Sequence, residues 1–346
     1  MHLRLAALGF GNVGRALAAM LAEKEAALRE RYGLSLVFTG AMTRSAGGWV
    51  APEGVSAATL AASGWPKGAP PAGTQPFTGD ALAFAREAPA DVLLELTTLN
   101  PRNGQPALDH VRAALGAGRH VATANKGPIA YAYRELRALA AERGVALRFE
   151  STVMDGTPIF SMAEASLPAT EIHGFTGLLN STSNYVLSRM AAGDSLEAAV
   201  AGAQAVGIAE ADPSNDLEGW DASVKATVLA NVLMGADLRP GGIIREGLGA
   251  DAMQRAQAAL PAGHALKQLV TAERDGDTDT VRARVRLVAL PPENAFAHVG
   301  IGETAVRLHT DTMRDLTIIE GDGDPGQTAF GLVADLVNIA RGRWTV

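Results

Sequence analysis

The chain has 346 residues, of which 47% are hydrophobic and 19% are charged, and it contains no cysteine. This is an ordinary globular composition, and the length is sufficient for two hydrophobic cores. The formal net charge of −7 and the absence of any basic run argue against a nucleic-acid-binding protein. Without cysteine, disulfides, thiolate metal ligands and a cysteine nucleophile are excluded.

The amino-terminal segment starts with an apolar stretch and lacks the basic start and the cleavage site of a secretory signal. No segment offers the roughly 18 uninterrupted apolar residues of a membrane-spanning helix. The lack of cysteine is compatible with a reducing compartment. These features predict a cytoplasmic protein with no membrane partner.

A strand, a glycine turn and a helix are predicted at the start of the chain. The strand His2–Leu8 is followed by Gly-Phe-Gly-Asn-Val-Gly at positions 9–14, and a helical pattern runs from Arg15 to Glu30. In this context the glycines permit a tight turn and close approach of the backbone to a pyrophosphate at the helix N-terminus. A glycine-rich turn without a ligand is the alternative. The motif favours dinucleotide binding, with the candidate residues Gly9, Gly11, Asn12, Val13 and Gly14.

The second predicted strand, Leu34–Met42, should end near the adenosine ribose of such a cofactor. NAD-specific sites usually carry an acidic residue there, whereas this chain has Thr43, Arg44 and Ser45. An arginine can pair with a 2′-phosphate, so Arg44 favours NADP, or use of both NADP and NAD. A solvated loop arginine explains the same residue equally well.

Residues 45–79 are rich in Gly, Pro, Ala and Ser, and we expect a loop with one short helix near Ser56–Ala62. Beyond this segment strands and helices alternate. A buried strand, Asp91–Leu96, ends at Thr97 and Thr98, and a helix is expected over Gly104–Ala117. Parallel strands carry ligand-binding residues at their C-terminal ends, so both threonines are candidates for cofactor contacts.

The next predicted strand, His120–Ala124, leads into Asn-Lys-Gly-Pro at positions 125–128. Lys126 is therefore expected in the crevice where a nicotinamide and its substrate would meet, although a lone lysine could equally lie on the surface. A helix over Tyr131–Arg143 and a strand over Ala146–Glu150 complete the alternating pattern. This pattern predicts an α/β fold with a doubly wound parallel sheet.

The pattern changes after Glu150 to an irregular segment, residues 151–158. It offers a carboxylate and several carbonyl oxygens, which would suit a hard cation. It is at least as consistent with a simpler arrangement in which Glu150 caps the following helix and Gly156 turns the chain. Both interpretations are open at this point.

A different unit begins near Glu171. We expect a strand over Ile172–Leu178, a polar stretch at 180–184, and then helices through Met190 and over 196–206 and 222–234. Strands are predicted over 281–289, 295–299, 305–310 and 316–320, and a final helix over 329–340. The succession predicts an α+β second domain with a mixed or antiparallel sheet.

The segment Ala209–Lys225 concentrates acidic residues before a strongly apolar helix. Asp221 and Lys225 are four residues apart and share one helix face, which is typical of an exposed ion pair on a surface helix. Glu210 and Asp216 precede them. A lysine held near several carboxylates can also donate a proton to a polar substrate whose hydroxyl or amino groups the carboxylates bind.

Taken together, these motifs resemble the homoserine dehydrogenase family, over essentially the whole chain and in the same order. Four blocks match: residues 9–14, Thr-Ala-Asn-Lys-Gly-Pro at 123–128, Gly-Leu-Leu-Asn-Ser-Thr-Ser-Asn-Tyr at 177–185, and Ala209–Lys225. The resemblance implies a Rossmann-type domain formed by 1–150 and rejoined by 320–346, with a catalytic and dimerisation domain over 151–319. It also implies a homodimer. Because the chain stops at Val346, we expect no ACT regulatory domain, which many relatives carry.

The resemblance implies reduction of L-aspartate 4-semialdehyde to L-homoserine with NADPH or NADH, a step of amino-acid biosynthesis toward threonine and methionine. Lys126 and Lys225 would polarise or protonate the carbonyl oxygen, and Asp221 would orient Lys225 or a water molecule. Glu210 and Asp216 would hold the small-molecule substrate, with Thr182 in the substrate loop. A monovalent cation, Na⁺ or K⁺, would bind at Glu150, Val153, Asp155 and Thr157, partly through backbone oxygens.

The chain departs from the family pattern at three places. Ser181 replaces the glycine usual in the substrate loop, Asp155 is acidic where a small residue is frequent, and the turn at 321–326 contains two aspartates and a proline. An alternative interpretation is therefore an NAD(P)-dependent paralogue acting on another small amino or hydroxy acid. A non-catalytic dinucleotide-binding protein is disfavoured because both lysines and the carboxylates Glu210, Asp216 and Asp221 are retained.

Overall fold

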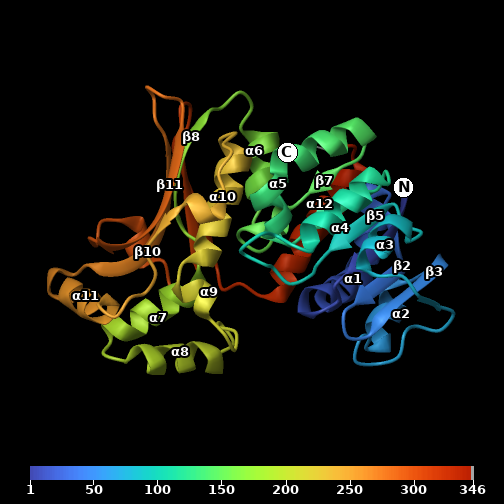
Figure 1. Ribbon diagram of the computed structural model, residues 1–346, viewed down its shortest axis with the longest axis horizontal. Helices are drawn as coiled ribbons and strands as arrows, with labels where there is room; N and C mark the ends of the chain where they lie inside the picture. Colours follow the sequence, from blue (N-terminus) through green and yellow to red (C-terminus); the bar gives the residue numbers. More distant parts are fainter. Residues whose placement is uncertain (344–346) are drawn as a thin grey trace. The chain divides into compact units, whose positions relative to one another are not determined.

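The computed structural model describes residues 1–343 (Figure 1). The chain forms two compact units, one built from Met1–Glu164 with the C-terminal segment that starts at Asp324, the other from Ala165–Gly323. The functional division into 1–150 with 320–346 and 151–319 remains a prediction, and residues 344–346 of that range lie outside the described residues.

The first unit contains a seven-stranded sheet in the order β4-β3-β2-β1-β5-β6-β7. Its strands are β1 (His2–Leu8), β2 (Ser35–Thr43), β3 (Gly47–Val55), β4 (Gln75–Phe77), β5 (Val92–Glu95), β6 (His120–Thr123) and β7 (Leu147–Arg148). From β2 to β7 neighbouring strands are parallel. The expected Rossmann-type parallel sheet is confirmed.

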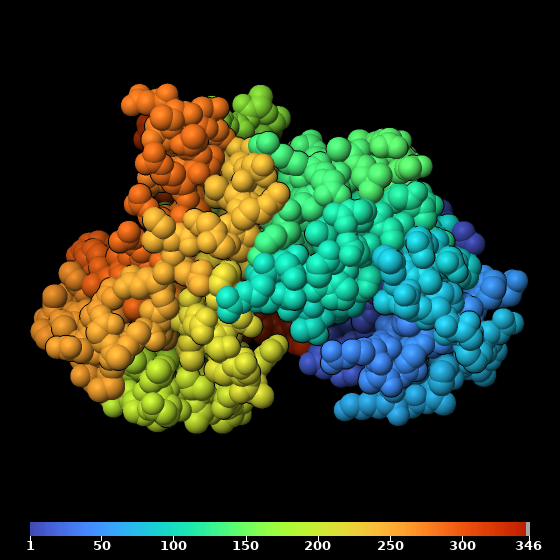
Figure 2. All heavy atoms as spheres, viewed as in Figure 1, coloured from blue at the N-terminus to red at the C-terminus, as the bar shows by residue number. Residues whose placement is uncertain are grey.

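Helices cover both faces of this sheet. They are α1 (Asn12–Tyr32), α2 (Ala57–Ser63), α3 (Ala81–Glu87), α4 (Ala107–Gly116), α5 (Lys126–Arg143), α6 (Ile159–Ser166), which runs into the second unit, and α12 (Pro325–Ala340). On one side α1 packs against α2 and α12, and on the other α4 packs against α3 and α5. Helix α12, red in the figures, buries Ala329, Leu332 and Leu336, and little of it is visible on the face shown in Figure 2.

The expectation of a loop over residues 45–79 is wrong in part, although the short helix α2 is confirmed. The antiparallel strands β3 and β4 extend the sheet beyond β2. Strand β3 forms because Trp49 is buried and packs edge-on against Trp65, which in turn contacts Phe10 of the glycine turn. This aromatic cluster joins residues far apart in the chain, so the local composition did not indicate it.

The second unit contains a mixed six-stranded sheet in the order β13-β12-β8-β10-β11-β9. Its strands are β8 (Ile172–Leu178), β9 (Ile244–Arg245), β10 (Ala265–Arg274), β11 (Val281–Leu290), β12 (Thr304–Thr310) and β13 (Arg314–Glu320). All pairs are antiparallel except β11 and β9. The expected α+β unit with a mixed or antiparallel sheet is confirmed.

The helices of the second unit are α7 (Ser181–Ala191), α8 (Leu196–Ala205), α9 (Ser214–Leu217), α10 (Trp220–Leu233) and α11 (Ala252–Ala259). Helix α10 packs on β10 and β11, while α7, α8 and α11 gather at one end of the sheet (Figure 1). A separate core forms there from apolar side chains of these three helices together with Leu266 and Leu287.

One sequence expectation for this unit is wrong, and one strand was not expected at all. Residues 295–298 form a short 3-10 helix instead of a strand, and the central strand β10 was not predicted. Lys267 and Gln268 interrupt the apolar pattern of β10, yet both are almost completely buried. The strand was not predicted because a lysine normally indicates an exposed position, whereas Lys267 is buried.

Candidate functional site

The glycine turn after β1 has the geometry of a dinucleotide-binding loop. Gly9 has a φ of +84°, and a Cβ at this position would overlap the backbone carbonyl of Leu96. At Gly11, the N-cap of α1, a Cβ would meet no atom within 4 Å. Gly9 is thus required by the fold of the turn, whereas the space beside Gly11 is open to a ligand.

The N-terminus of α1 suits a pyrophosphate. No side chain caps it, and its first turn carries no acidic residue, so the backbone N–H groups of Asn12 and Val13 and the positive end of the helix dipole can face an anion. Arg44 lies in the exposed turn between β2 and β3. These residues fit a dinucleotide, and an exposed guanidinium at the end of β2 is compatible with a 2′-phosphate.

A buried polar network joins the C-terminal ends of β5 and β6. Asn125 is the N-cap of α5: its Oδ1 accepts from Gly127 N at 2.9 Å, and its Nδ2 donates to the carbonyl of Thr97 at 3.0 Å. The Thr97 hydroxyl donates to the buried carboxylate of Glu95. Lys126 follows as the first residue of α5 and is half-buried, while Thr98 is exposed. The network fixes the position from which Lys126 extends.

In the second unit, one amide holds two of the predicted carboxylates. Asn180 Nδ2 donates to Asp216 Oδ1 at 2.7 Å and to Asp221 Oδ2 at 3.1 Å. The Oδ1 atom of Asn180 accepts from Ser183 N and thereby caps α7. Residues from the end of β8, from α9 and from α10 therefore meet at one point.

Lys225 completes this cluster. Its Nζ donates to the carbonyl of Leu179 at 2.6 Å and lies 3.2 Å from Asp221 Oδ2. The side chains of Lys225 and Asp221 are only 15% and 14% exposed, so the pair is shielded from water, unlike an ordinary surface pair on a helix. We call Asn180, Asp216, Asp221 and Lys225 the carboxylate–lysine cluster.

Thr182 and Glu210 lie differently with respect to this cluster. Thr182 is buried in the first turn of α7, and its hydroxyl donates to the carbonyl of Ile208 at 3.1 Å. Glu210 lies in the loop between α8 and α9 with an exposed side chain, and its backbone carbonyl accepts from Gln204. Ser181, one of the departures from the family pattern, is the first residue of α7.

The segment proposed for a cation lies in the first unit, against the N-terminal part of α12. The carboxylate of Glu150 accepts from the backbone N–H groups of Phe160 and Ser161, both at 2.8 Å, and so caps the start of α6. Asp155 Oδ1 accepts from Thr328. Burial raises the pKa of the Glu150 carboxyl. The hydrogen bonds that this carboxylate accepts from α6 lower the pKa and so counteract part of the shift. A cation at this segment would therefore depend on backbone oxygens rather than on Glu150 Oε atoms.

Val153 is buried in the same turn, and Thr157 is half-buried. Among residues 1–343 no group of three or more His, Cys, Asp and Glu side chains is placed to hold a metal ion.

In the same part of the chain no helix is both long and apolar enough to cross a bilayer.

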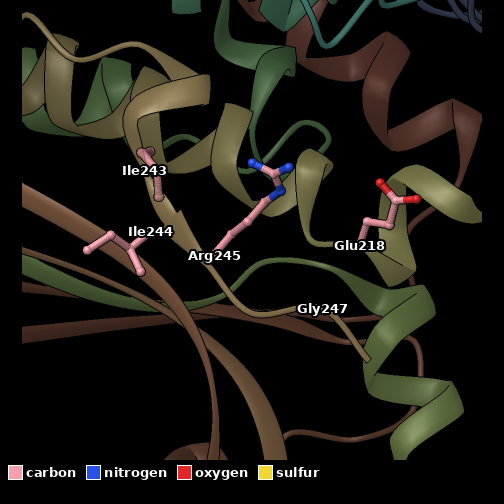
Figure 3. Close-up of a pocket in the computed structure, with 5 residues that line it drawn as sticks. All are labelled: Glu218, Ile243, Ile244, Arg245 and Gly247. Atoms are coloured by element: carbon pink, nitrogen blue, oxygen red, sulfur yellow. The ribbon is translucent and has the colours of Figure 1, made fainter. Parts of the chain in front are cut away.

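An open pocket lies beside the start of α10, lined by Glu218, Ile243, Ile244, Arg245 and Gly247 (Figure 3). Arg245 and Ile244 extend to different sides of β9 (Figure 3). The guanidinium carbon of Arg245 stands 3.5 Å from the centre of the Trp220 ring, a cation–π contact that holds the first residue of α10. Asp221 and Lys225 do not line this pocket.

Comparison with known proteins identifies the family. The profile of the homoserine dehydrogenase domain matches residues 158–337, and that of the homoserine dehydrogenase NAD-binding domain matches residues 9–150. The chain is 35% identical to an NAD(+)-dependent homoserine dehydrogenase of Pseudomonas canavaninivorans, over 97% of this chain and 96% of the relative. The chain belongs to the homoserine dehydrogenase family.

Further relatives agree. A homoserine dehydrogenase of Methanocaldococcus jannaschii is 30% identical over 96% of this chain and 97% of its own. The crystal structure of a putative homoserine dehydrogenase from Archaeoglobus fulgidus matches with a TM-score of 0.84 at 26% identity, over 99% of this chain and 100% of that one. A hyperthermophilic archaeal homoserine dehydrogenase in complex with NADPH matches with a TM-score of 0.81 at 25% identity, over 99% and 98%.

Membership makes the protein an NAD(P)-dependent oxidoreductase that takes a small-molecule substrate. From the sequence, Asn180 was expected only as part of a polar stretch and Asn125 only at the end of a strand. Both asparagines are N-caps, and the signal that could have found them is an Asn immediately before a helix, at the end of a strand.

Proposed function

We propose that this protein interconverts L-aspartate 4-semialdehyde and L-homoserine, with Lys126 and Lys225 acting on the oxygen at the reacting carbon. The observation that supports these roles best is the carboxylate–lysine cluster, in which a shielded lysine is held by one carbonyl and one carboxylate. An ion pair with a purely structural role would need only Asp221 and Lys225, whereas here Asn180 also holds Asp216 beside them through a hydrogen bond.

The bound nicotinamide supplies hydride for reduction of the aldehyde and accepts it in the reverse direction. Lys225 would donate a proton to the carbonyl oxygen as the alkoxide develops and recover it in homoserine oxidation, which is general acid–base catalysis. Asp221 would keep the ammonium group oriented. Lys126, at the start of α5, would add a second positive charge that stabilises the developing alkoxide.

Asp216 and Glu210 would bind the amino and hydroxyl groups of the substrate, and Thr182 would shape the substrate loop. The half-buried position of Asp216 supports a direct contact. Glu210 is exposed in the loop between α8 and α9, so its carboxylate is accessible to a ligand.

For the cofactor, we propose that Gly9, Gly11, Asn12, Val13 and Gly14 form the pyrophosphate loop and that Thr97 and Thr98 flank the nicotinamide half. Arg44 would pair with the 2′-phosphate of NADP, so NADP would be used in addition to NAD. A monovalent cation would bind backbone oxygens of Glu150, Val153, Asp155 and Thr157. The cation would hold this turn against α12.

We further propose that the protein works as a cytoplasmic homodimer. Exposed apolar side chains of the second unit, among them Met313 and Ile319, each 55% exposed, support a partner surface on that unit. Sedimentation velocity at micromolar concentration would measure the oligomeric state. A monomer under these conditions would refute the dimer.

The test is homoserine oxidation at alkaline pH with NADP or NAD, followed through the absorbance of the reduced cofactor. We expect Lys225→Ala and Lys126→Ala each to lower kcat by about 10²–10⁴-fold while cofactor affinity stays close to that of the unchanged protein. Lys24→Ala is the control, because Lys24 is a lysine of α1 whose side chain is 42% exposed and forms an ion pair with its neighbour Glu23.

Near-normal turnover in either lysine variant would refute the assigned role of that residue. Cofactor binding by the unchanged protein without homoserine oxidation would instead indicate a paralogue with a different substrate. A preference for NADP that disappears in Arg44→Ala would support the 2′-phosphate contact.

A further inference from the structure

A buried lysine that the proposed chemistry does not use lies in the centre of the second unit. Lys267, on β10, is 5% exposed. Its Nζ donates to Asn184 Oδ1 at 2.7 Å and to the carbonyl of Val299 at 3.0 Å. Lysine side chains usually keep the ammonium group in water, so the burial of this ammonium group requires an explanation.

The two acceptors of Lys267 are uncharged carbonyl oxygens. Burial lowers the pKa of Lys267, and the nearby carboxylate of Glu303 counteracts this shift in part. A chain that needed only apolar packing here would gain by replacing the lysine with an aliphatic side chain. Lys267 therefore differs from an aliphatic side chain at this position through the hydrogen bonds that its ammonium group donates.

These hydrogen bonds extend in two directions. Asn184 Nδ2 donates to the carbonyl of Gly300 at 2.7 Å, and Gly300 N donates to Glu303 Oε2 at 2.7 Å. The ammonium group of Lys267 thus joins β10, the first turns of α7 and the segment 299–303 that leads into β12. Asn184 is 1% exposed, so the contact is protected from water.

Asn184 is also tied to the start of its own helix. Its backbone N–H donates to the carbonyl of Asn180, the residue that caps α7 and holds Asp216 and Asp221. Thr182 lies between them in the same turn. A displacement of Asn184 would therefore be transmitted over one helical turn to the carboxylate–lysine cluster.

We propose that Lys267 is a positioning residue for the substrate: through Asn184 it fixes the N-terminus of α7 and thereby Asn180 and Thr182. It touches neither substrate nor cofactor. This inference rests on the proposed substrate role of that helix N-terminus, which it deepens.

The first measurement is homoserine kinetics of Lys267→Met, which keeps most of the side-chain volume and removes the ammonium group. We expect the KM for homoserine to rise by about tenfold or more, because Asn180 and Thr182 belong to the proposed substrate site. Cofactor affinity should be unchanged, because the glycine turn belongs to the first unit. Hydrogen exchange of residues 181–190 should become faster. Lys267→Arg, which retains a cationic donor, should recover part of the KM.

The matched control is Asn231→Ala. Asn231 is also buried, and its amide also pins a loop of the second unit, through two hydrogen bonds to Leu238 at the far end of α10. This variant should lose stability without changing the KM for homoserine or the exchange of residues 181–190.

Should Lys267→Met not fold, Asn184→Ala decides the question, because it removes the acceptor and leaves the lysine in place; the same rise in KM is expected. A folded Lys267→Met or Asn184→Ala protein with unchanged homoserine KM and unchanged exchange of α7 would overturn the proposal. If the unchanged protein does not oxidise homoserine, the proposed function fails, and the exchange measurement alone decides the role of Lys267.

Discussion

The glycine turn of the first unit and the carboxylate–lysine cluster of the second are built in opposite ways. The turn consists of six consecutive residues, and Gly9 and Gly11 contribute to it by having no side chain. The cluster joins the end of β8 with α9 and α10, and it depends on hydrogen bonds from one amide, Asn180, to two carboxylates.

This difference has a physical consequence. At Gly9 the missing side chain is a steric requirement of the fold, whereas at Gly11 it leaves space for a ligand. Substitutions in the turn should therefore have different effects at different positions. A hydrogen-bonded cluster loses single contacts while the others remain, so its substitutions should act in graded steps.

The largest effect is expected at Gly9. Gly9→Ala places a Cβ against the carbonyl of Leu96 at a φ of +84°, which should cost on the order of 3 kcal/mol and abolish cofactor binding. Gly11→Ala meets no protein atom, so it should leave thermal stability unchanged and weaken cofactor binding by about tenfold or more, the equivalent of about 1.4 kcal/mol. Thermal melting and fluorescence titration with NADPH and NADH measure both quantities.

Gly33→Ala serves as the control for these variants. Gly33 ends α1 with a φ of +61° and has open space around its Cα, so only the backbone penalty of about 1 kcal/mol is expected, with normal cofactor affinity. Equal cofactor affinities of Gly11→Ala and Gly33→Ala would show that the ligand does not approach Gly11.

An intermediate effect is expected at Asn180. Asn180→Asp keeps the cap of α7 but replaces the donor with a third carboxylate beside Asp216 and Asp221, so kcat/KM for homoserine should fall by about 10²-fold, the equivalent of about 2.7 kcal/mol. Asn180→Ala loses the donor and the cap, so it should also lower the melting temperature. Steady-state kinetics and thermal melting separate the two contributions.

Ser195→Ala isolates the effect of a lost cap. Ser195 caps α8 through Ala198 N in the same unit, and its replacement should cost about 1 kcal/mol of stability without altering homoserine kinetics. Normal activity of Asn180→Asp would contradict the importance of the amide donor.

The smallest effect is expected at Asp335, a buried carboxylate with no proposed ligand. Burial, and then the neighbouring Glu150, raise the pKa of Asp335 well above its usual value of 3.8, so the folded protein binds this proton more tightly than the unfolded chain. The stability from this group is present at low pH and is lost as pH rises from about 4 through the raised value. Asp335→Asn should therefore be more stable than the unchanged protein at pH 8, on the order of 1 kcal/mol, with no difference near pH 4.

Urea unfolding at the two pH values measures this difference, and homoserine kinetics should be unchanged. Asp277→Asn, at an exposed position, is the matched control for the removal of one carboxylate. Lower stability of Asp335→Asn at pH 8 would mean that the hydrogen bond from Glu150 N, at 3.0 Å, outweighs the burial of charge.

How far the sequence predicts the structure depends on how local each feature is. The glycine turn, the parallel strands and the helices α1, α4 and α10 follow from periodicity and from adjacent residues. Strand β10 was not predicted because Lys267 and Gln268 resemble surface residues, although each has a hydrogen-bond partner in a distant part of the chain. Strand β3 escaped because Trp49 packs against Trp65, sixteen positions further along the chain.

The candidate site shows the same limit. The spacing of Asp221 and Lys225 predicted their pairing on one helix face, and the structure contains that pair. The spacing could not indicate that Asn180, more than 30 positions earlier, would bring Asp216 to the same point. For Glu150 the sequence left two interpretations open, and the structure contains one of them, the cap of the following helix α6.

By itself, the sequence determined the order of elements, the dinucleotide loop and the residue types available for chemistry, because these depend on neighbours within one or two turns of chain. Only the tertiary structure decided which polar side chains are buried together, which carboxylates share a donor, and that a lysine lies inside the second unit. The physical reason is that a buried polar group is stable only where a partner satisfies it, and the partner is set by packing between distant segments.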